Sequence, residues 1–140
     1  MARILIIDRD ETVRETLGVF SEMLGYEPLY AEDAATCQAI HSANQSCSAE
    51  NACAEILLID QRLQTMTGLE FVERQIQKGC KAATNCKAVM SDALTKQEFM
   101  LARQLGCYVL QKPVTYEIFE NWLQSISQKQ AEKSSQRSEL

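Results

Sequence analysis

Four short apolar runs along the chain each lead to a polar side chain suited to phosphoryl chemistry. Runs of this length, bounded by polar residues, are typical of buried strands in a parallel sheet. Ligands of such sheets bind beyond the carboxyl ends of the strands, so the four polar side chains are expected to meet there. They comprise two carboxylates, a hydroxyl and a lysine, which suit a divalent cation and a phosphoryl group. Residues 4–7, 56–59, 88–90 and 108–110 form the runs, and Asp8, Asp60, Ser91 and Lys112 are the polar residues.

Helical patterns separate these strands, and residues 28–31 add a weaker second strand after the first helix. Glycines at 25, 79 and 106 are placed to end three of the helices. Five strand–helix units in alternation predict an open parallel sheet with helices on both faces. Side chains suited to cap helix starts are Asp10, Asp33, Thr95 paired with Glu98 in a capping box, and Thr115.

The composition fits one compact domain with its own core, since the chain has 140 residues and 46% of them are hydrophobic. A net charge of -5 and a pI near 4.9 argue against nucleic-acid or membrane-surface partners. We see no signal peptide and no membrane span, so a cytoplasmic location is expected. The domain is expected over 1–126. Residues 127–140 are polar and without periodicity, which predicts a disordered tail.

Six cysteines are present, and their location in a core-rich chain favours reduced thiols over a disulfide scaffold. Two pairs are spaced six apart in loops expected at the amino-end edge of the sheet. A four-thiolate zinc site or a disulfide is conceivable there, but the spacing is wider than in usual zinc knuckles, so we predict no metal and half-buried thiols in loops. The pairs are Cys47 with Cys53 and Cys80 with Cys86, while Cys37 and Cys107 are expected in the core.

From residue 3 to about 126 the chain resembles the receiver domain of bacterial two-component response regulators. In that family an acidic pair follows the first strand, a phosphate-accepting Asp ends the third, Thr or Ser ends the fourth, and Lys-Pro follows the fifth. The matching positions here are Asp8-Arg9, Asp60, Ser91 and Lys112-Pro113, and the spacing from Asp60 through Met66 to Gly68 is also similar. The resemblance implies an α/β, flavodoxin-like (βα)5 three-layer sandwich with strand order 2-1-3-4-5.

The resemblance also implies a chemistry. Asp60 would take a phosphoryl group from a phosphohistidine on a histidine kinase or phosphotransfer protein. Mg²⁺ would be held by Asp8, Asp60 and the backbone carbonyl of Arg62. Lys112 would pair with Asp60 and then with the phosphoryl oxygens, to which Ser91 would donate a hydrogen bond. Output would pass by contact to a downstream protein, through the last two helices and the fifth strand. The domain would be no enzyme beyond self-catalysed phosphorylation and dephosphorylation.

Two positions depart from the family. Arg9 stands where a second acid is usual. Replacing a carboxylate with a guanidinium about 6 Å from a dication weakens the binding free energy of the ion by on the order of 3 kcal/mol, even at the dielectric constant of water. Asp10 and Asp92 are the candidates to replace the missing ligand. Val109 stands where an aromatic ring usually changes rotamer, and strand alternation points the neighbouring Tyr108 to the opposite face.

Two other functions stay open. In a degenerate receiver, Arg9 would occupy the metal position and bridge to Asp60, and the domain would bind partners without phosphate control. Alternatively, residues 8–12 resemble the DxDxT motif of haloacid-dehalogenase-type phosphatases, with Asp8 as nucleophile and Asp10 as general acid. That enzyme would leave Asp60 without a role, and no further acidic segment follows Lys112 for its metal. A single-domain receiver that is phosphorylated on Asp60 is the leading hypothesis.

Overall fold

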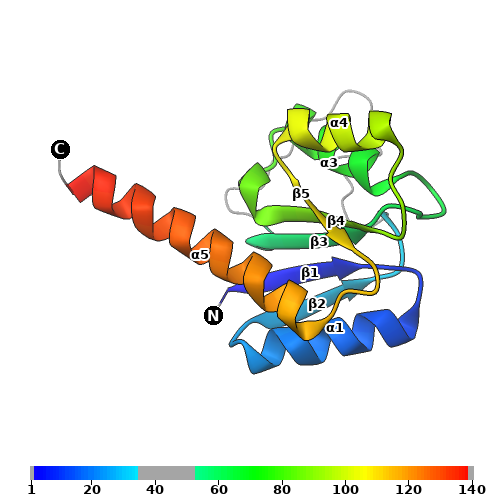
Figure 1. The fold of residues 1–140 in the computed structure, drawn as a ribbon, viewed down its shortest axis with the longest axis horizontal. Coiled ribbons are helices and arrows are strands. Elements are labelled where there is room, and N and C mark those ends of the chain that lie inside the picture. The colour runs from blue at the N-terminus through cyan, green and yellow to red at the C-terminus, as the bar shows by residue number, and fades with distance from the viewer. Residues whose placement is uncertain (1, 35–52, 139–140) are drawn as a thin grey trace.

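A computed structural model describes residues 2–34 and 53–138, with side chains described as far as 128. Five parallel strands form one sheet in the order β2-β1-β3-β4-β5, so the predicted fold and strand order are confirmed (Figure 1). The helix expected from Asp33, which would carry Cys37, lies outside the described residues. The elements are β1 (Arg3–Ile7), α1 (Glu11–Met23), β2 (Glu27–Ala31), β3 (Ile56–Asp60), α3 (Gly68–Gln77), a 3₁₀ turn (Thr84–Cys86), β4 (Lys87–Ser91), α4 (Lys96–Leu105), β5 (Tyr108–Gln111) and α5 (Tyr116–Ser138).

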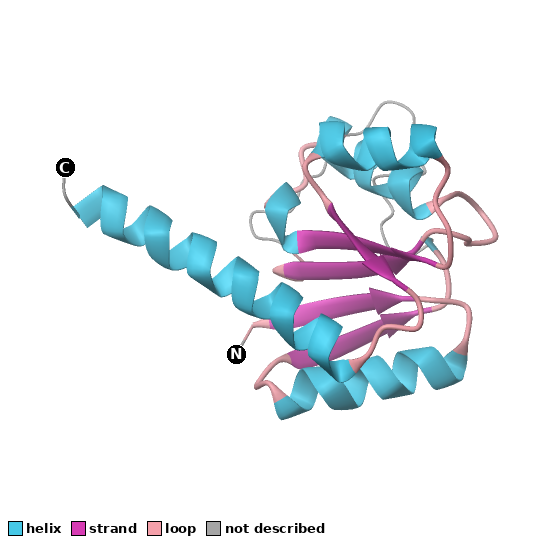
Figure 2. Ribbon diagram, viewed as in Figure 1, coloured by secondary structure: helices cyan, strands magenta, loops and turns pink. Residues whose placement is uncertain are grey.

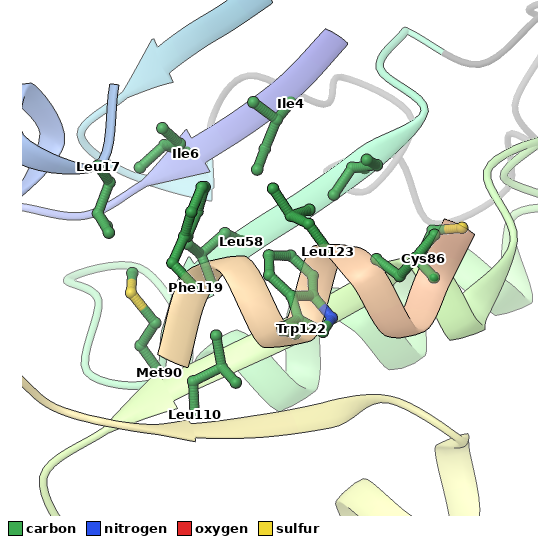
Figure 3. Close-up of a cluster of buried hydrophobic side chains, with 13 residues drawn as sticks. Ile4, Ile6, Leu17, Leu58, Cys86, Met90, Leu110, Phe119, Trp122 and Leu123 are labelled. Atoms are coloured by element: carbon green, nitrogen blue, oxygen red, sulfur yellow. The ribbon is translucent and has the colours of Figure 1, made fainter. Parts of the chain in front are cut away.

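Helices cover both faces of the sheet, with α1 and α5 on one side and α3 and α4 on the other (Figure 2). Because side chains alternate between the two faces along β1, Ile4 and Ile6 pack in a first core, beneath α1 and α5, and Ile7 packs in a second core, beneath α3 and α4. In the first core, Phe119 and Trp122 of α5 lie against these strands (Figure 3). Burial on both faces explains why the strands are nearly continuous apolar runs.

The helix ends follow the predicted caps. The side chain of Asp10 accepts hydrogen bonds from the backbone N–H groups of Thr12 and Val13 at the start of α1. Thr95 and Glu98 form the reciprocal capping box of α4. α4 ends at Gly106, whose φ of 76° lies in the left-handed region that favours glycine. α1 therefore starts where its local sequence predicts, and α4 both starts and ends where its local sequence predicts.

The end of the chain differs from our expectation of a disordered tail from 127. α5 continues to Ser138 and its last turns project away from the body of the domain (Figure 1). The helix is already nucleated on the core through Phe119 and Trp122, so extending it adds one hydrogen bond per residue. Eight of the twelve residues from 127 to 138 are Gln, Lys, Ala, Glu or Arg, which are good helix formers. Within the described residues, no helix combines the length and apolar character needed to span a membrane.

The described cysteines are free thiols in three environments. Cys80 is half-buried as predicted, but Cys53 is exposed where a half-buried thiol was expected, and Cys86 is buried in the core beneath α1 and α5. Placing Cys86 in a loop as a half-buried thiol was wrong, because the 3₁₀ turn before β4 aims it inward. Cys107 is buried, as predicted. Cys37 and Cys47 lie outside the described residues, and in the part of the chain that is described no group of three or more His, Cys, Asp or Glu side chains is placed to hold a metal ion.

Candidate functional site

The four predicted polar side chains come from one edge of the sheet. Asp8 follows β1, Asp60 ends β3, Ser91 ends β4 and Lys112 follows β5. These strands are neighbours and all parallel, so their carboxyl ends lie side by side. The backbone continues the pairing beyond the strands, because the N–H of Lys112 donates to the carbonyl of Ser91 over 3.0 Å. The structure therefore brings the set together at the expected edge.

Lys112 lies between the two carboxylates. Its Nζ is 2.9 Å from Asp8 Oδ2 and 3.2 Å from Asp60 Oδ1. The side chain of Asp8 is 2% exposed and that of Asp60 is 11% exposed, whereas Lys112 is 18% exposed. Two nearly buried negative charges thus share one positive charge, and the cluster carries an excess of one negative charge.

The electrostatics of the cluster follow from this imbalance. Burial raises the pKa of Asp60, and the nearby Asp8 carboxylate raises it further, against the opposing effects of Lys112 and the Arg62 N–H. Burial acts to lower the pKa of Lys112, but Asp8 and Asp60 outweigh it, and the net pKa is raised. Lys112 is therefore charged at neutral pH, while a second cation would relieve the repulsion between Asp8 and Asp60.

The donor set suits Mg²⁺, which commonly binds through one or two carboxylates and keeps several waters. Asp8 and Asp60 supply two buried carboxylates. The carboxylate of Asp10 is used to cap α1, and its backbone N–H donates to Asp8 Oδ1 over 2.9 Å. Asp92 and Arg9 are both exposed, and in the described part of the chain no ion pair joins Arg9 to Asp60. Asp8, Asp60 and the predicted Arg62 carbonyl therefore form the set that would hold the ion.

The residues at the ends of β4 and β5 are arranged as follows. Ser91 is buried, and its Oγ accepts a hydrogen bond from the Ala93 N–H at 3.2 Å. Its hydroxyl hydrogen is free to be donated, since the bond to Ala93 uses only an oxygen lone pair.

Val109 packs toward α3 and α4, and Tyr108 toward α1 and α5, as strand alternation predicted. Val109 offers no ring and no polar atom on the α4 side.

Local sequence patterns gave no indication that Gln61, which follows Asp60, is buried and hydrogen-bonded through both its backbone and its side chain. Gln61 as a whole residue is 1% exposed. Its Oε1 accepts from the Leu69 N–H at 3.0 Å, and its Nε2 donates to Glu98 Oε2 at 2.5 Å. Glu98 also pairs with Arg62, at 3.2 Å from Nη2. Hydrogen bonds from the Thr95 N–H and from Gln61 hold the pKa of Glu98 below its usual value against the opposing effect of burial.

The loop from Asp60 to α3 is closely packed. A Cβ placed on Gly68 would lie 2.7 Å from the backbone oxygen of Asp60, so only glycine allows this approach. Asp33, which follows β2, accepts hydrogen bonds from the backbone N–H and the hydroxyl of Thr65. The loop carrying Arg62 is thus held to Asp33 through Thr65 and packed on the end of β3 through Gly68.

A hollow of about 380 Å³ lies beside Lys112, between the start of α1 and the turn into α5. Its lining is mainly apolar and includes Val13, Leu17, Met90 and Pro113. One wall of the hollow is the lysine that contacts both carboxylates, so a molecule placed there would lie next to the cluster.

No protein-family model and no curated protein matches the sequence. Solved structures do match: a CheY-like response regulator receiver domain protein from Methanospirillum hungatei JF-1 is 24% identical, with a TM-score of 0.70 over 97% of this chain and 98% of that one. A two-component response regulator from Clostridium difficile is 20% identical, with a TM-score of 0.72 over 93% and 98%. The chemotaxis protein CheY4 of Vibrio cholerae is 21% identical, with a TM-score of 0.68 over 89% and 98%. The chain therefore has the fold of CheY-like response regulator receiver domains.

Proposed function

We propose that the chain is a receiver of two-component signal transduction that accepts a phosphoryl group on Asp60. The observation that carries the proposal is the placement of Lys112 within 3.2 Å of Asp60 and 2.9 Å of Asp8, at the carboxyl edge of a receiver-type sheet. Phosphoryl transfer depends on alignment and charge neutralisation more than on covalent assistance by the protein. A buried carboxylate beside a lysine, a second carboxylate and a serine supplies those elements.

In the transfer step, one carboxylate oxygen of Asp60 attacks the phosphorus of a phosphohistidine in line with the P–N bond. The new O–P bond forms as the P–N bond breaks, and the imidazole nitrogen keeps the electron pair. The ammonium group of Lys112 pairs with the Asp60 carboxylate before the transfer and with the phosphoryl oxygens after it. Ser91 donates its hydroxyl hydrogen to one of these oxygens. Bound Mg²⁺ would neutralise the charge of Asp8, Asp60 and the phosphoryl group. The side chains of Asp60 and Lys112 are partly exposed, so water can reach the acyl phosphate and hydrolyse it.

The two alternatives receive less support from the geometry. A degenerate receiver would bridge Arg9 to Asp60, yet Arg9 is exposed, and the cation that pairs with Asp60 among the described residues is Lys112. A haloacid-dehalogenase-type enzyme needs Asp10 as a general acid, yet Asp10 caps α1 with its carboxylate. We therefore keep phosphorylation on Asp60 as the proposed activity. A histidine kinase or phosphotransfer protein as donor, a protein target as output and a cytoplasmic location belong to the same proposal.

Acetyl phosphate with Mg²⁺ tests the proposal directly. Intact mass should show one added phosphoryl group on the wild type and none on Asp60→Asn. Asp8→Asn should slow the reaction without abolishing the acceptor, because it removes a metal ligand and not the nucleophile. Wild-type protein that stays unmodified would favour the degenerate receiver. Phosphatase turnover that survives Asp60→Asn and is lost in Asp8→Asn would favour the enzyme.

A further inference from the structure

Gln61 connects the loop after Asp60 to two helices. Its backbone N–H donates to the carbonyl of Met90 at 2.9 Å, and its backbone oxygen accepts from the Gly68 N–H at 3.1 Å. Its side chain accepts from Leu69 at the start of α3 and donates to Glu98 at the start of α4. One partner is a donor and the other a carboxylate, so the orientation of the amide is fixed by its contacts.

Glu98 is the point where this network meets α4. One of its oxygens accepts from the Thr95 N–H at 3.0 Å in the capping box and also pairs with Arg62. The other accepts from Gln61. Glu98 therefore has two tasks, which are to cap α4 and to hold the two residues that follow Asp60. Any displacement of those residues acts on the first turn of α4.

We propose that Gln61 is a positioning residue that couples the occupancy of Asp60 to the start of α4 through Glu98. This inference rests on the proposed function. A phosphoryl group on Asp60 adds negative charge one residue before the network, and Glu98 is the carboxylate of that network. The backbone of Gly68 is packed tightly on this segment, because a Cβ at Gly68 would lie 2.7 Å from the Asp60 backbone oxygen and the Gly68 N–H donates to the Gln61 carbonyl. A shift at Asp60 is therefore passed on to Gln61.

The consequence appears at the surface of α4. Phe99 and Met100, which directly follow Glu98, are 50% and 53% exposed. Loading Asp60 would loosen the bond between Gln61 and Glu98 and change the stability of the turn that presents these two apolar side chains. Coupling is reciprocal, so a protein that binds this turn would in turn alter how readily Asp60 holds its ligand. The route passes through hydrogen bonds and does not require a ring at Val109.

Hydrogen exchange of the Glu98 and Phe99 amides tests the coupling, with Mg²⁺ and beryllofluoride as the probe of a loaded Asp60. In the wild type, beryllofluoride should change their exchange rates by about fivefold, the factor that one net hydrogen bond contributes. In Gln61→Met, which keeps the length of the side chain without its polar atoms, the change should fall below about twofold. Gln97→Met, an exposed substitution on the same helix, should respond like the wild type.

Fluorine NMR of bound beryllofluoride, recorded on the same samples, separates the two proposals. Bound probe with an unchanged α4 turn in the wild type would contradict the coupling alone, as would an undiminished response in Gln61→Met. Failure of the wild type to bind the probe would contradict both proposals. Should Gln61→Met fold poorly, Glu98→Ala removes the acceptor of the same Gln61–Glu98 hydrogen bond. The Phe99 amide of this variant should no longer respond to beryllofluoride.

Discussion

Replacing Lys112 with methionine should destabilise the domain strongly, because it leaves two buried carboxylates without their shared cation. At an effective dielectric constant of about 20, each contact near 3 Å corresponds to about 5 kcal/mol of gross attraction, most of it offset by desolvation. Removing one partner of a buried ion pair typically costs about 3–5 kcal/mol. The side chain of Lys112 is 18% exposed, so the site is partly open, and we expect about 3 kcal/mol.

Urea denaturation followed by Trp122 fluorescence measures this loss, since Trp122 is the sole tryptophan and is buried. The measurement should be made without Mg²⁺. The loss should shrink as pH falls from about 7 to about 4, because burial and Asp8 raise the pKa of Asp60 and its protonation removes the repulsion. Adding Asp8→Asn to Lys112→Met should recover about half of the lost stability. Lys81→Met, which removes an exposed charge, should change stability by less than about 0.5 kcal/mol.

A Lys112→Met protein that loses less than about 1 kcal/mol, the range of exposed ion pairs, would show that Lys112 does not neutralise two buried charges. A loss that does not depend on pH would also contradict that role, because repulsion between carboxylates must vanish on protonation. Absence of recovery in the double variant would place the cause outside the Asp8–Asp60 pair.

Three further outcomes follow. Without Mg²⁺ at neutral pH, Asp60→Asn should be more stable than the wild type by on the order of 1 kcal/mol in urea. Burial and Asp8 raise the folded-state pKa of Asp60 above 3.8, so wild-type stability falls as pH rises through that pKa, and the difference should vanish below pH 3.8. Gly68→Ala should lower the free energy of unfolding measured in urea by about 1–3 kcal/mol and slow modification by acetyl phosphate, because its Cβ meets the backbone of Asp60. Burial raises the pKa of the Cys107 thiol to about 11, so peptide mapping after iodoacetamide at neutral pH should find Cys53 alkylated well before Cys107.

Local chemistry explains why much of the fold could be predicted. The strands were evident because both of their faces are buried, which removes polar residues from the runs that end at Asp8 and Asp60. The caps of α1 and α4 depend on side chains within three residues of the helix start, so Asp10 and Thr95 mark them in the sequence. The meeting of Asp8, Asp60 and Lys112 followed from the topology, because parallel strands end at one edge.

Longer-range contacts explain the rest. Gln61 has the polarity of a loop residue, and its partner Glu98 is 37 positions away, so no local period marks its burial. Cys86 is buried by helices that lie elsewhere in the sequence. The extension of α5 was missed because polar segments without periodicity are also typical of disorder. The roles of Ser91 and of the metal ligands stay predictions, since they concern chemistry and not placement.

The central claim is that Asp60 carries the phosphoryl group, and the most direct measurement locates that group after reaction with acetyl phosphate and Mg²⁺. Borohydride reduction converts an aspartyl phosphate to homoserine, which peptide sequencing by mass spectrometry then places in the chain. We predict homoserine at position 60 and nowhere else. Homoserine at position 8, or no homoserine in fully folded protein, would contradict it.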